Sequence, residues 1–139
     1  MYEYYMFYAL TYSQNSTCNR ANVGAVIVKD EEIISVGTNM NLPGMCNCDK
    51  EGHTLVGNHC INTIHAEQDA LMYCLQKGVS TRGATMYVTH YPCLTCAKLI
   101  VASGIREVYY KYGYNIDDYA VKLFEANGVL VQEAKGSNI

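Results

Sequence analysis

The alternation of strand-like and helix-like segments in the second half of the sequence most constrains how the chain can fold. Three segments are rich in β-branched and aromatic residues, as strands are: 84–90 (ATMYVTH), 106–112 (REVYYKY) and 129–134 (VLVQEA). The segments between them, 94–103 and 117–127, have the apolar spacing of helices, and each is followed by a glycine, Gly104 and Gly128. Strands that alternate with helices pair in parallel, so we expect a layered α/β sheet.

The first half of the sequence predicts an antiparallel hairpin and two helices. The β-branched runs VGAVIVKD (23–30) and IISVGTN (33–39) are separated by a short acidic turn, and such a turn joins antiparallel neighbours. The segments expected to be helical are 1–14 and 63–77. Thr63 is expected to cap the start of the second helix, and Gly78 its end.

Length, composition and charge limit the class of protein. With 139 residues, half of them apolar, the chain is expected to form a single domain over residues 1–139. A net charge of −3 gives no basic surface for general nucleic-acid binding, so we expect no nucleic-acid partner. No run of about 18 apolar residues predicts a membrane span, and the apolar N-terminus carries Glu3 without the cationic region of a signal peptide. We therefore expect a cytoplasmic protein without a membrane partner, in the host cytoplasm if a phage encodes it.

Two short motifs carry three side chains of the kinds that bind zinc. IHAEQ (64–68) places His65 in the first turn of an expected helix, and YPCLTC (91–96) places Cys93 and Cys96 where another helix begins. Residues three apart on a helix face the same way, and a helix N-terminus favours the thiolate that a metal ligand requires. One imidazole and two thiolates leave the fourth position of a tetrahedral zinc ion open, as in catalytic sites.

Glu67 supplies the second element of a catalytic site. It lies two residues after His65, close enough to reach a water molecule on the metal without being a ligand. The pattern H-x-E followed by P-C-x-x-C is that of zinc-dependent nucleobase deaminases. Two other interpretations of the cysteine pair remain, a thioredoxin-like dithiol and a structural zinc finger, but neither requires His65 and Glu67 at these positions. Cys74, in a helical pattern, is expected to be a buried thiol.

The chain resembles the deoxycytidylate (dCMP) deaminases of the short type found in phages and Gram-positive bacteria. The resemblance lies in four segments: 16–28 (STCNRANVGAVIV), 48–67 (CDKEGHTLVGNHCINTIHAE), 83–98 (GATMYVTHYPCLTCAK) and 103–110 (SGIREVYY). It implies a three-layer α-β-α fold of the cytidine-deaminase type, with a five-stranded mixed sheet flanked by helices. It also implies a zinc-dependent homohexamer that hydrolyses dCMP to dUMP and ammonia, which supplies dTMP synthesis.

The resemblance further implies regulation by nucleotides. In the family dCTP activates and dTTP inhibits, and Mg²⁺ would accompany these triphosphates. Effector contacts are expected at Gly37 and Asn39. Family members commonly have GYNG here, whereas this chain has Gly37-Thr38-Asn39-Met40. Because the aromatic ring and the second glycine are lost, we expect a weaker response to dCTP than in members with GYNG.

Four residues are expected to contact the substrate. Arg20 would bind the 5′-phosphate, although an arginine at this place could equally be a surface charge. Asn39 would hold the sugar, Tyr91 would pack near the base, and Ala66 would line the pocket between the predicted ligand and the predicted proton shuttle.

A second, structural zinc site is expected from the ligand-type residues that the catalytic site leaves over. These residues are Cys18, Cys46, Cys48, His53, His59 and Cys60. Four of them could close a tetrahedral site and order the irregular segment 42–62. By resemblance to the family, we predict Cys18, Cys48 and His53 as ligands, with His59 or Cys60 as the fourth. The alternative is that these thiols and imidazoles bind no metal.

Two other functions stay open. A nucleic-acid base deaminase, similar to the tRNA adenosine deaminases, would share the zinc motif, but the acidic composition argues against it. A non-catalytic, zinc-bound nucleotide sensor would share the fold, but the intact Glu67 argues against it.

Overall fold

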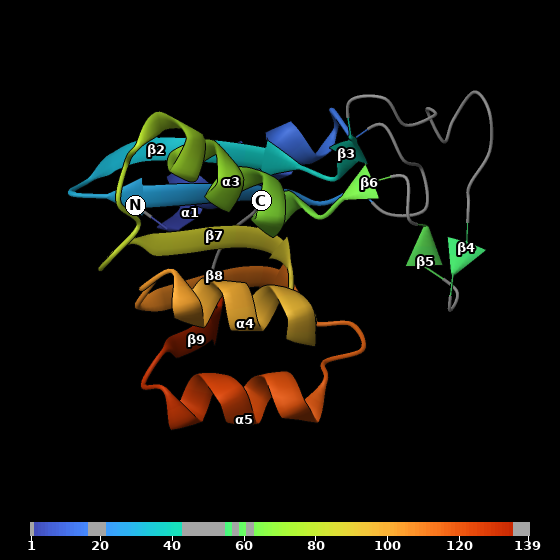
Figure 1. The fold of residues 1–139 in the computed structure, drawn as a ribbon, viewed down its shortest axis with the longest axis vertical. Helices are drawn as coiled ribbons and strands as arrows, with labels where there is room; N and C mark the ends of the chain where they lie inside the picture. The colour runs from blue at the N-terminus through green and yellow to red at the C-terminus, as the bar shows by residue number, and fades with distance from the viewer. Residues whose placement is uncertain (1, 17–21, 43–54, 57–58, 61–62, 135–139) are drawn as a thin grey trace.

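The central feature of the fold is a five-stranded sheet, in the order β2-β1-β7-β8-β9 (Figure 1). The computed structural model describes residues 2–16, 22–42, 55–56, 59–60 and 63–134. The strands of the sheet are β1 (Gly24–Lys29), β2 (Glu32–Thr38), β7 (Thr85–His90), β8 (Glu107–Tyr112) and β9 (Leu130–Glu133). Two small sheets accompany it, one from β3 (Met40–Asn41) and β6 (Thr63–Ile64), the other from β4 (Leu55–Val56) and β5 (His59–Cys60).

Helices cover both faces of this sheet (Figure 1). They are α1 (Tyr2–Ser13), α3 (Ala66–Lys77), α4 (Leu94–Ala102) and α5 (Asp118–Ala126). The residues of β1 alternate between two cores: Val26 packs with α1, and Ile27 packs with α3 and α4. The second core also holds Phe124 of α5. None of the helices in the described part of the chain is long and apolar enough to cross a bilayer.

The strand directions confirm the predicted mixed sheet. β1 and β2 form an antiparallel hairpin in which Gly24 lies opposite Thr38, and Asp30 and Glu31 make its turn with φ angles of 52° and 65°. β1 pairs antiparallel with β7, whereas β7, β8 and β9 pair in parallel. Parallel neighbours need a crossover, and α4 and α5 provide it. The three-layer α/β fold expected from the sequence is therefore confirmed.

The start of α3 differs from the prediction. Thr63 does not cap the helix, because it pairs with Asn41 between β6 and β3, and His65 is the capping residue instead. The backbone N–H of His65 donates to Oε1 of Gln68 at 3.0 Å, which satisfies a donor at the helix start. The other end agrees with the prediction, since Gly78 closes the helix with a φ of 69°. The correction places His65 at the N-terminal tip of α3.

Two glycines allow helices to lie directly against the sheet. A Cβ on Gly37 of β2 would meet the carbonyl oxygen of Ala66 and would lie 2.6 Å from the backbone nitrogen of Ala70, both in α3. A Cβ on Gly24 would meet α1 in the same way, with the nitrogen of Ser13 at 2.8 Å. The contact at Gly37 fixes the height of α3 above β2, and with it the position of the first turn of α3.

Candidate metal centre and catalytic site

The candidate site lies where the N-terminal ends of α3 and α4 meet. His65 precedes α3, and Cys93 precedes α4, each with the extended backbone of a capping residue. Cys96 lies in the first turn of α4 and is buried, and Pro92 is buried beside it at the end of the loop that leaves β7. The fold therefore brings together two motifs that are 28 residues apart in sequence.

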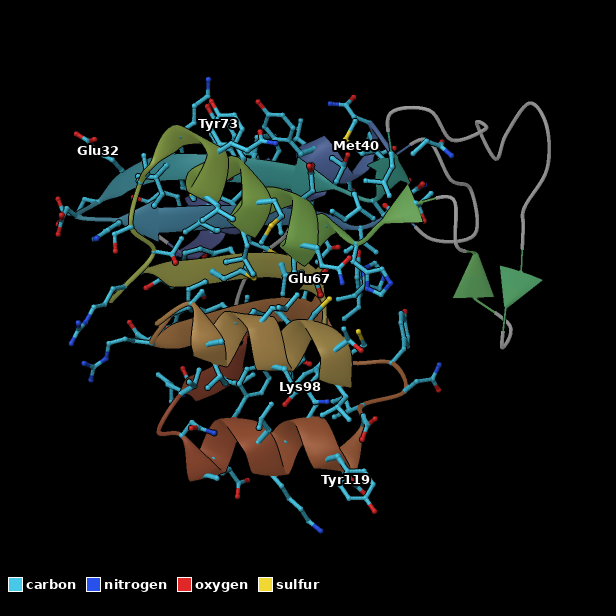
Figure 2. The ribbon with its side chains drawn as sticks, in the orientation of Figure 1. Glu32, Met40, Glu67, Tyr73, Lys98 and Tyr119 are labelled. Carbon is cyan, nitrogen blue, oxygen red and sulfur yellow. The ribbon has the colours of Figure 1, made fainter. Side chains whose placement is uncertain are left out.

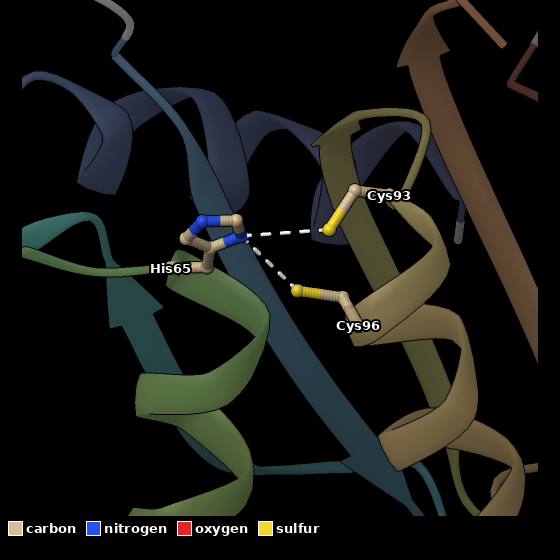
Figure 3. Close-up of side chains that lie close together, drawn as sticks. All are labelled: His65, Cys93 and Cys96. Atoms are coloured by element: carbon tan, nitrogen blue, oxygen red, sulfur yellow. Dashed lines mark hydrogen bonds between the residues drawn. The ribbon is translucent and has the colours of Figure 1, made fainter. Parts of the chain in front are cut away.

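The geometry of the three side chains fits a zinc ion. Nδ1 of His65 lies 3.3 Å from Sγ of Cys96 and 3.7 Å from Sγ of Cys93 (Figure 3). All three ligand atoms lie within 4.8 Å of one another. Ideal zinc bonds in a tetrahedron would hold a nitrogen and a sulfur roughly 3.6 Å apart. The three side chains could therefore hold the ion without rearrangement, and among the described residues they are the group with this property.

The two thiols have very different acidities. A hydrogen bond from the Cys96 thiol, together with the nearby His65, lowers the pKa of Cys93 to about 4. The same hydrogen bond and burial raise the pKa of Cys96. The hydrogen bond to Cys93 also raises the pKa of His65. The lowered pKa of Cys93 favours its thiolate, which is the form that binds a metal.

Glu67 is a buried carboxyl group beside this site. Only 5% of its surface is exposed, and Figure 2 shows it at the end of α3 that faces α4. Burial raises the pKa of Glu67 to about 7. The nearby His65 and a hydrogen bond with the Cys96 thiol oppose this rise in pKa, so both side chains lie close to the carboxyl group. A carboxyl group with a pKa near neutrality can both accept and donate a proton, which suits general acid–base catalysis.

The predicted substrate residues lie in different surroundings. Ala66 is buried directly beside the candidate ligand His65. Asn39 is buried at the end of β2, where its Oδ1 accepts from the backbone N–H of Val23 at 2.9 Å. The ring of Tyr91 packs against Tyr110, with centroids 4.9 Å apart, and it lies partly buried against the core, near Phe124 of α5.

The remaining predicted site residues lie outside the described part of the chain. They are Cys18, Arg20, Cys48 and His53. For His59 and Cys60 the structure describes the backbone, as β5, but not the side chains. The second zinc site and the phosphate contact therefore stay predictions. Gly37, predicted to contact effectors, lies under α3 as described above.

The structure adds two polar side chains near the site. Asp69 lies one turn after His65 on α3, and its Oδ2 accepts from the backbone N–H of Thr38 at 3.2 Å. Thr89 accepts from the N–H of Gly24 at 3.1 Å, and its hydroxyl lies 2.8 Å from Nδ1 of His90. The spacing of four residues between His65 and Asp69 could have revealed the first from sequence. Nothing in the sequence reveals that Gly24 is a partner of Thr89, because Gly24 comes from a distant strand.

Comparisons with known proteins identify the family. Residues 1–112 match the model of the cytidine and deoxycytidylate deaminase zinc-binding region. ComE operon protein 2 of Bacillus subtilis (strain 168) is 43% identical over 133 residues, which cover 96% of this chain and 70% of that protein. The deoxycytidylate deaminase of Mycobacterium phage D29 is 38% identical over 120 residues, which cover 78% of this chain and 91% of the phage protein.

A solved structure extends this similarity to the fold. The crystal structure of dCMP deaminase from the cyanophage S-TIM5, in complex with dCMP and dUMP, matches with a TM-score of 0.83 and 35% identity over 95% of both chains. The chain therefore belongs to the cytidine and deoxycytidylate deaminase family of hydrolases, and the resemblance seen in the sequence is confirmed. The zinc-binding character of the family agrees with the His65, Cys93 and Cys96 group.

Proposed function

We propose that the protein hydrolyses dCMP to dUMP and ammonia, with His65, Cys93 and Cys96 as zinc ligands and Glu67 as the proton carrier. The observation that carries this proposal is a buried carboxyl group beside three side chains with zinc-ligand spacing. The choice of dCMP is supported by the 35% identical cyanophage deaminase, whose structure holds dCMP and dUMP. A small nucleotide also agrees with the acidic composition of the chain.

The proposed mechanism assigns the proton transfers to Glu67. Zinc, when bound by the three ligands, supplies Lewis acidity that makes the attacking water more acidic. The Glu67 carboxylate accepts a proton from this water and passes it to N3 of the cytosine ring, while the water oxygen attacks C4. Glu67 then carries the second water proton to the exocyclic amine, which leaves as ammonia. Burial favours this role, because it excludes bulk water and raises the pKa of Glu67 toward neutrality.

The substrate contacts remain as the sequence predicts them. We propose that Arg20 binds the 5′-phosphate, that the Asn39 amide holds the sugar, and that Ala66 lines the base pocket. The Asn39 side chain is well suited to a fixed contact, since its Oδ1 is held by the backbone of Val23. The ring of Tyr91 packs against Tyr110, so Tyr91 would affect the base by positioning the loop between β7 and α4.

The most direct test is an ammonia-release assay on the purified protein. We expect turnover of dCMP, and none of dAMP or of cytidine within an oligonucleotide. Turnover of an oligonucleotide without turnover of dCMP would favour the nucleic-acid base deaminase. Absence of turnover with every substrate in a zinc-loaded protein would favour the nucleotide sensor. Including cytidine and dCTP would define which phosphates the site accepts.

We further propose that one catalytic domain spans residues 1–139, that it assembles into a cytoplasmic homohexamer, and that it binds a second zinc ion. Cys18, Cys48 and His53, with His59 or Cys60, remain the proposed ligands. The backbone pairing of β4 and β5 supports an ordered arrangement around the last two. Light scattering at several protein concentrations tests the hexamer, and a dimer or monomer at all of them would exclude it.

The metal content separates the two proposed zinc sites. We expect two zinc ions per chain in the fully loaded protein. Cys93→Ala should abolish turnover, because it removes a ligand beside Glu67. Cys48→Ala should instead lower the melting temperature, because a structural zinc ion contributes to folding free energy. Metal analysis and thermal melting of both variants check this, and one zinc ion in the loaded wild type would remove the second site.

We expect regulation with an altered balance between the two effectors. dTTP should still inhibit, because it shares phosphate contacts with the substrate. Activation by dCTP, with or without Mg²⁺, should be weaker than in family members with GYNG. Thr38 has no aromatic ring for stacking, and it is buried with its N–H donating to Asp69. The Met40 side chain takes space that a glycine would leave open. Steady-state curves in dCMP test this, and strong sigmoidality that low dCTP removes completely would contradict it.

A further inference from the structure

A cavity of about 550 Å³ lies at the end of the sheet opposite the candidate catalytic site. It is formed by the turns that lead into β7, β8 and β9. Its lining includes Arg82, Gly83, Gly104, Arg106, Asn127 and Gly128. The catalytic motif follows the other end of β7, and this six-residue strand alone places the two sites roughly 20 Å apart.

The charged side chains in the lining of the cavity are both arginines. Arg82 comes from the turn before β7 and Arg106 from the turn before β8, and no carboxylate lines the cavity. Within the described residues, no ion pair joins either guanidinium to an acidic side chain. Glu107, the neighbour of Arg106 in sequence, is engaged by the hydroxyl of Tyr109 at 3.0 Å. The cavity therefore carries two positive charges that nothing in its lining neutralises.

Three turn glycines leave the cavity open. A Cβ on Gly83 or on Gly128 would meet no atom within 4 Å. A Cβ on Gly104 would lie 3.3 Å from Cβ and from Cγ of Arg82, so the missing side chain lets the stem of Arg82 lie against this turn. Asn127 donates one Nδ2 hydrogen to the carbonyl of Leu123 at 2.8 Å, which leaves the other for a ligand.

The backbone offers little to a ligand here. The N–H of Gly83 donates to the carbonyl of Gly104 at 2.8 Å, and those of Gly104 and Gly128 donate to Val101 and Glu125. α4 and α5 also end at this cavity, and helix C-termini do not attract anions. Any anion would therefore be bound by the side chains, and chiefly by the two guanidinium groups.

We propose that this cavity binds a small phosphate-bearing molecule between Arg82 and Arg106. Each guanidinium presents a planar fork that matches two oxygens of a phosphate group, and two forks favour a ligand with more than one negative charge. The volume is in the range of sites for small molecules and exceeds what one phosphate group fills. The proposal does not rest on the identity of the catalytic substrate, because the two sites share no residue.

Calorimetric titration with inorganic pyrophosphate tests the proposal. The titration is done at about 0.15 M salt, where attraction between charges that are not in contact is largely screened. We expect saturable binding to the wild type, and a loss of roughly tenfold or more in affinity for Arg82→Gln and for Arg106→Gln. Lys122→Gln, which removes an exposed cation from α5, is the matched control and should bind as the wild type does. Both arginines are exposed, so the variants should keep the wild-type melting temperature.

A second variant separates this cavity from the substrate site. Arg20→Ala removes the proposed contact for the substrate phosphate and should leave pyrophosphate binding unchanged. In a ¹⁵N-labelled protein, pyrophosphate should shift the amide signals of Gly83, Gly104 and Gly128. Absence of saturable binding would overturn the proposal. Binding that Arg20→Ala abolishes and the two arginine variants do not would also overturn it, because it would place the anion in the substrate site.

Discussion

Glu67→Gln is expected to lower the turnover number for dCMP by about 10²- to 10⁴-fold, the range that a general acid–base group contributes. The amide keeps the shape of the side chain but cannot carry a proton from water to the base. Zinc content should not change, because Glu67 is not one of the three ligand-type side chains. The melting temperature should not fall, since a neutral amide is less costly to bury than a carboxylate. Steady-state kinetics, metal analysis and thermal melting of the same preparation measure the three quantities.

Asp69→Asn provides the matched control for this variant. Asp69 is a partly buried carboxyl group on the same helix, and burial raises its pKa as well. It accepts from the N–H of Thr38, and an asparagine keeps an oxygen for this bond. We therefore expect a turnover number close to that of the wild type. Turnover at the wild-type rate in zinc-loaded Glu67→Gln would rule out the proposed proton carrier, whatever the control shows.

The parts of the fold that local sequence determines could be predicted. Each crossover helix is followed by a glycine, Gly104 after α4 and Gly128 after α5. The strands that these helices connect are rich in β-branched and aromatic residues, so the parallel half of the sheet follows from short segments. The three candidate zinc ligands were also predictable, because each lies at the start of a helix: His65 and Cys93 cap α3 and α4, and Cys96 is in the first turn of α4. Their positions relative to their own helices are set locally, and the sheet then brings the two helix ends together.

The parts that depend on distant contacts could not be predicted. Thr63 has the chemistry of a helix cap, but its pairing with Asn41 in a small sheet takes precedence. Tyr91 comes directly after β7, where the alternation of side chains between the two faces of the sheet ends. The alternation therefore could not predict that the Tyr91 ring points toward Tyr110. The acceptor role of Asn39 toward Val23 depends on how the end of β2 meets the start of β1. Such contacts need the packed structure.

Gly37→Ala is expected to lower both stability and catalysis, although Gly37 is not one of the three candidate zinc ligands. The added methyl group would overlap backbone atoms of α3, the carbonyl of Ala66 and the nitrogen of Ala70 at 2.6 Å. Backbone atoms cannot rotate away as a side chain can, so α3 must move off the sheet. Overpacking of this kind typically costs about 1–3 kcal/mol. We expect a lower midpoint in denaturant-induced unfolding.

The same movement should disturb the site, because Ala66 lies between His65 and Glu67 in the chain. A shift of about 1 Å in a catalytic group can cost roughly 10²-fold in rate, so turnover should fall well below what the fraction of unfolded protein explains. Gly24→Ala supplies the matched control, since its methyl group would overlap α1 on the opposite face, with the nitrogen of Ser13 at 2.8 Å. It should be destabilising to a similar degree, yet retain zinc affinity and turnover at a temperature where it is folded. Equal losses of turnover in the two folded variants would mean that the close contact between Gly37 and the backbone of α3 does not position the site.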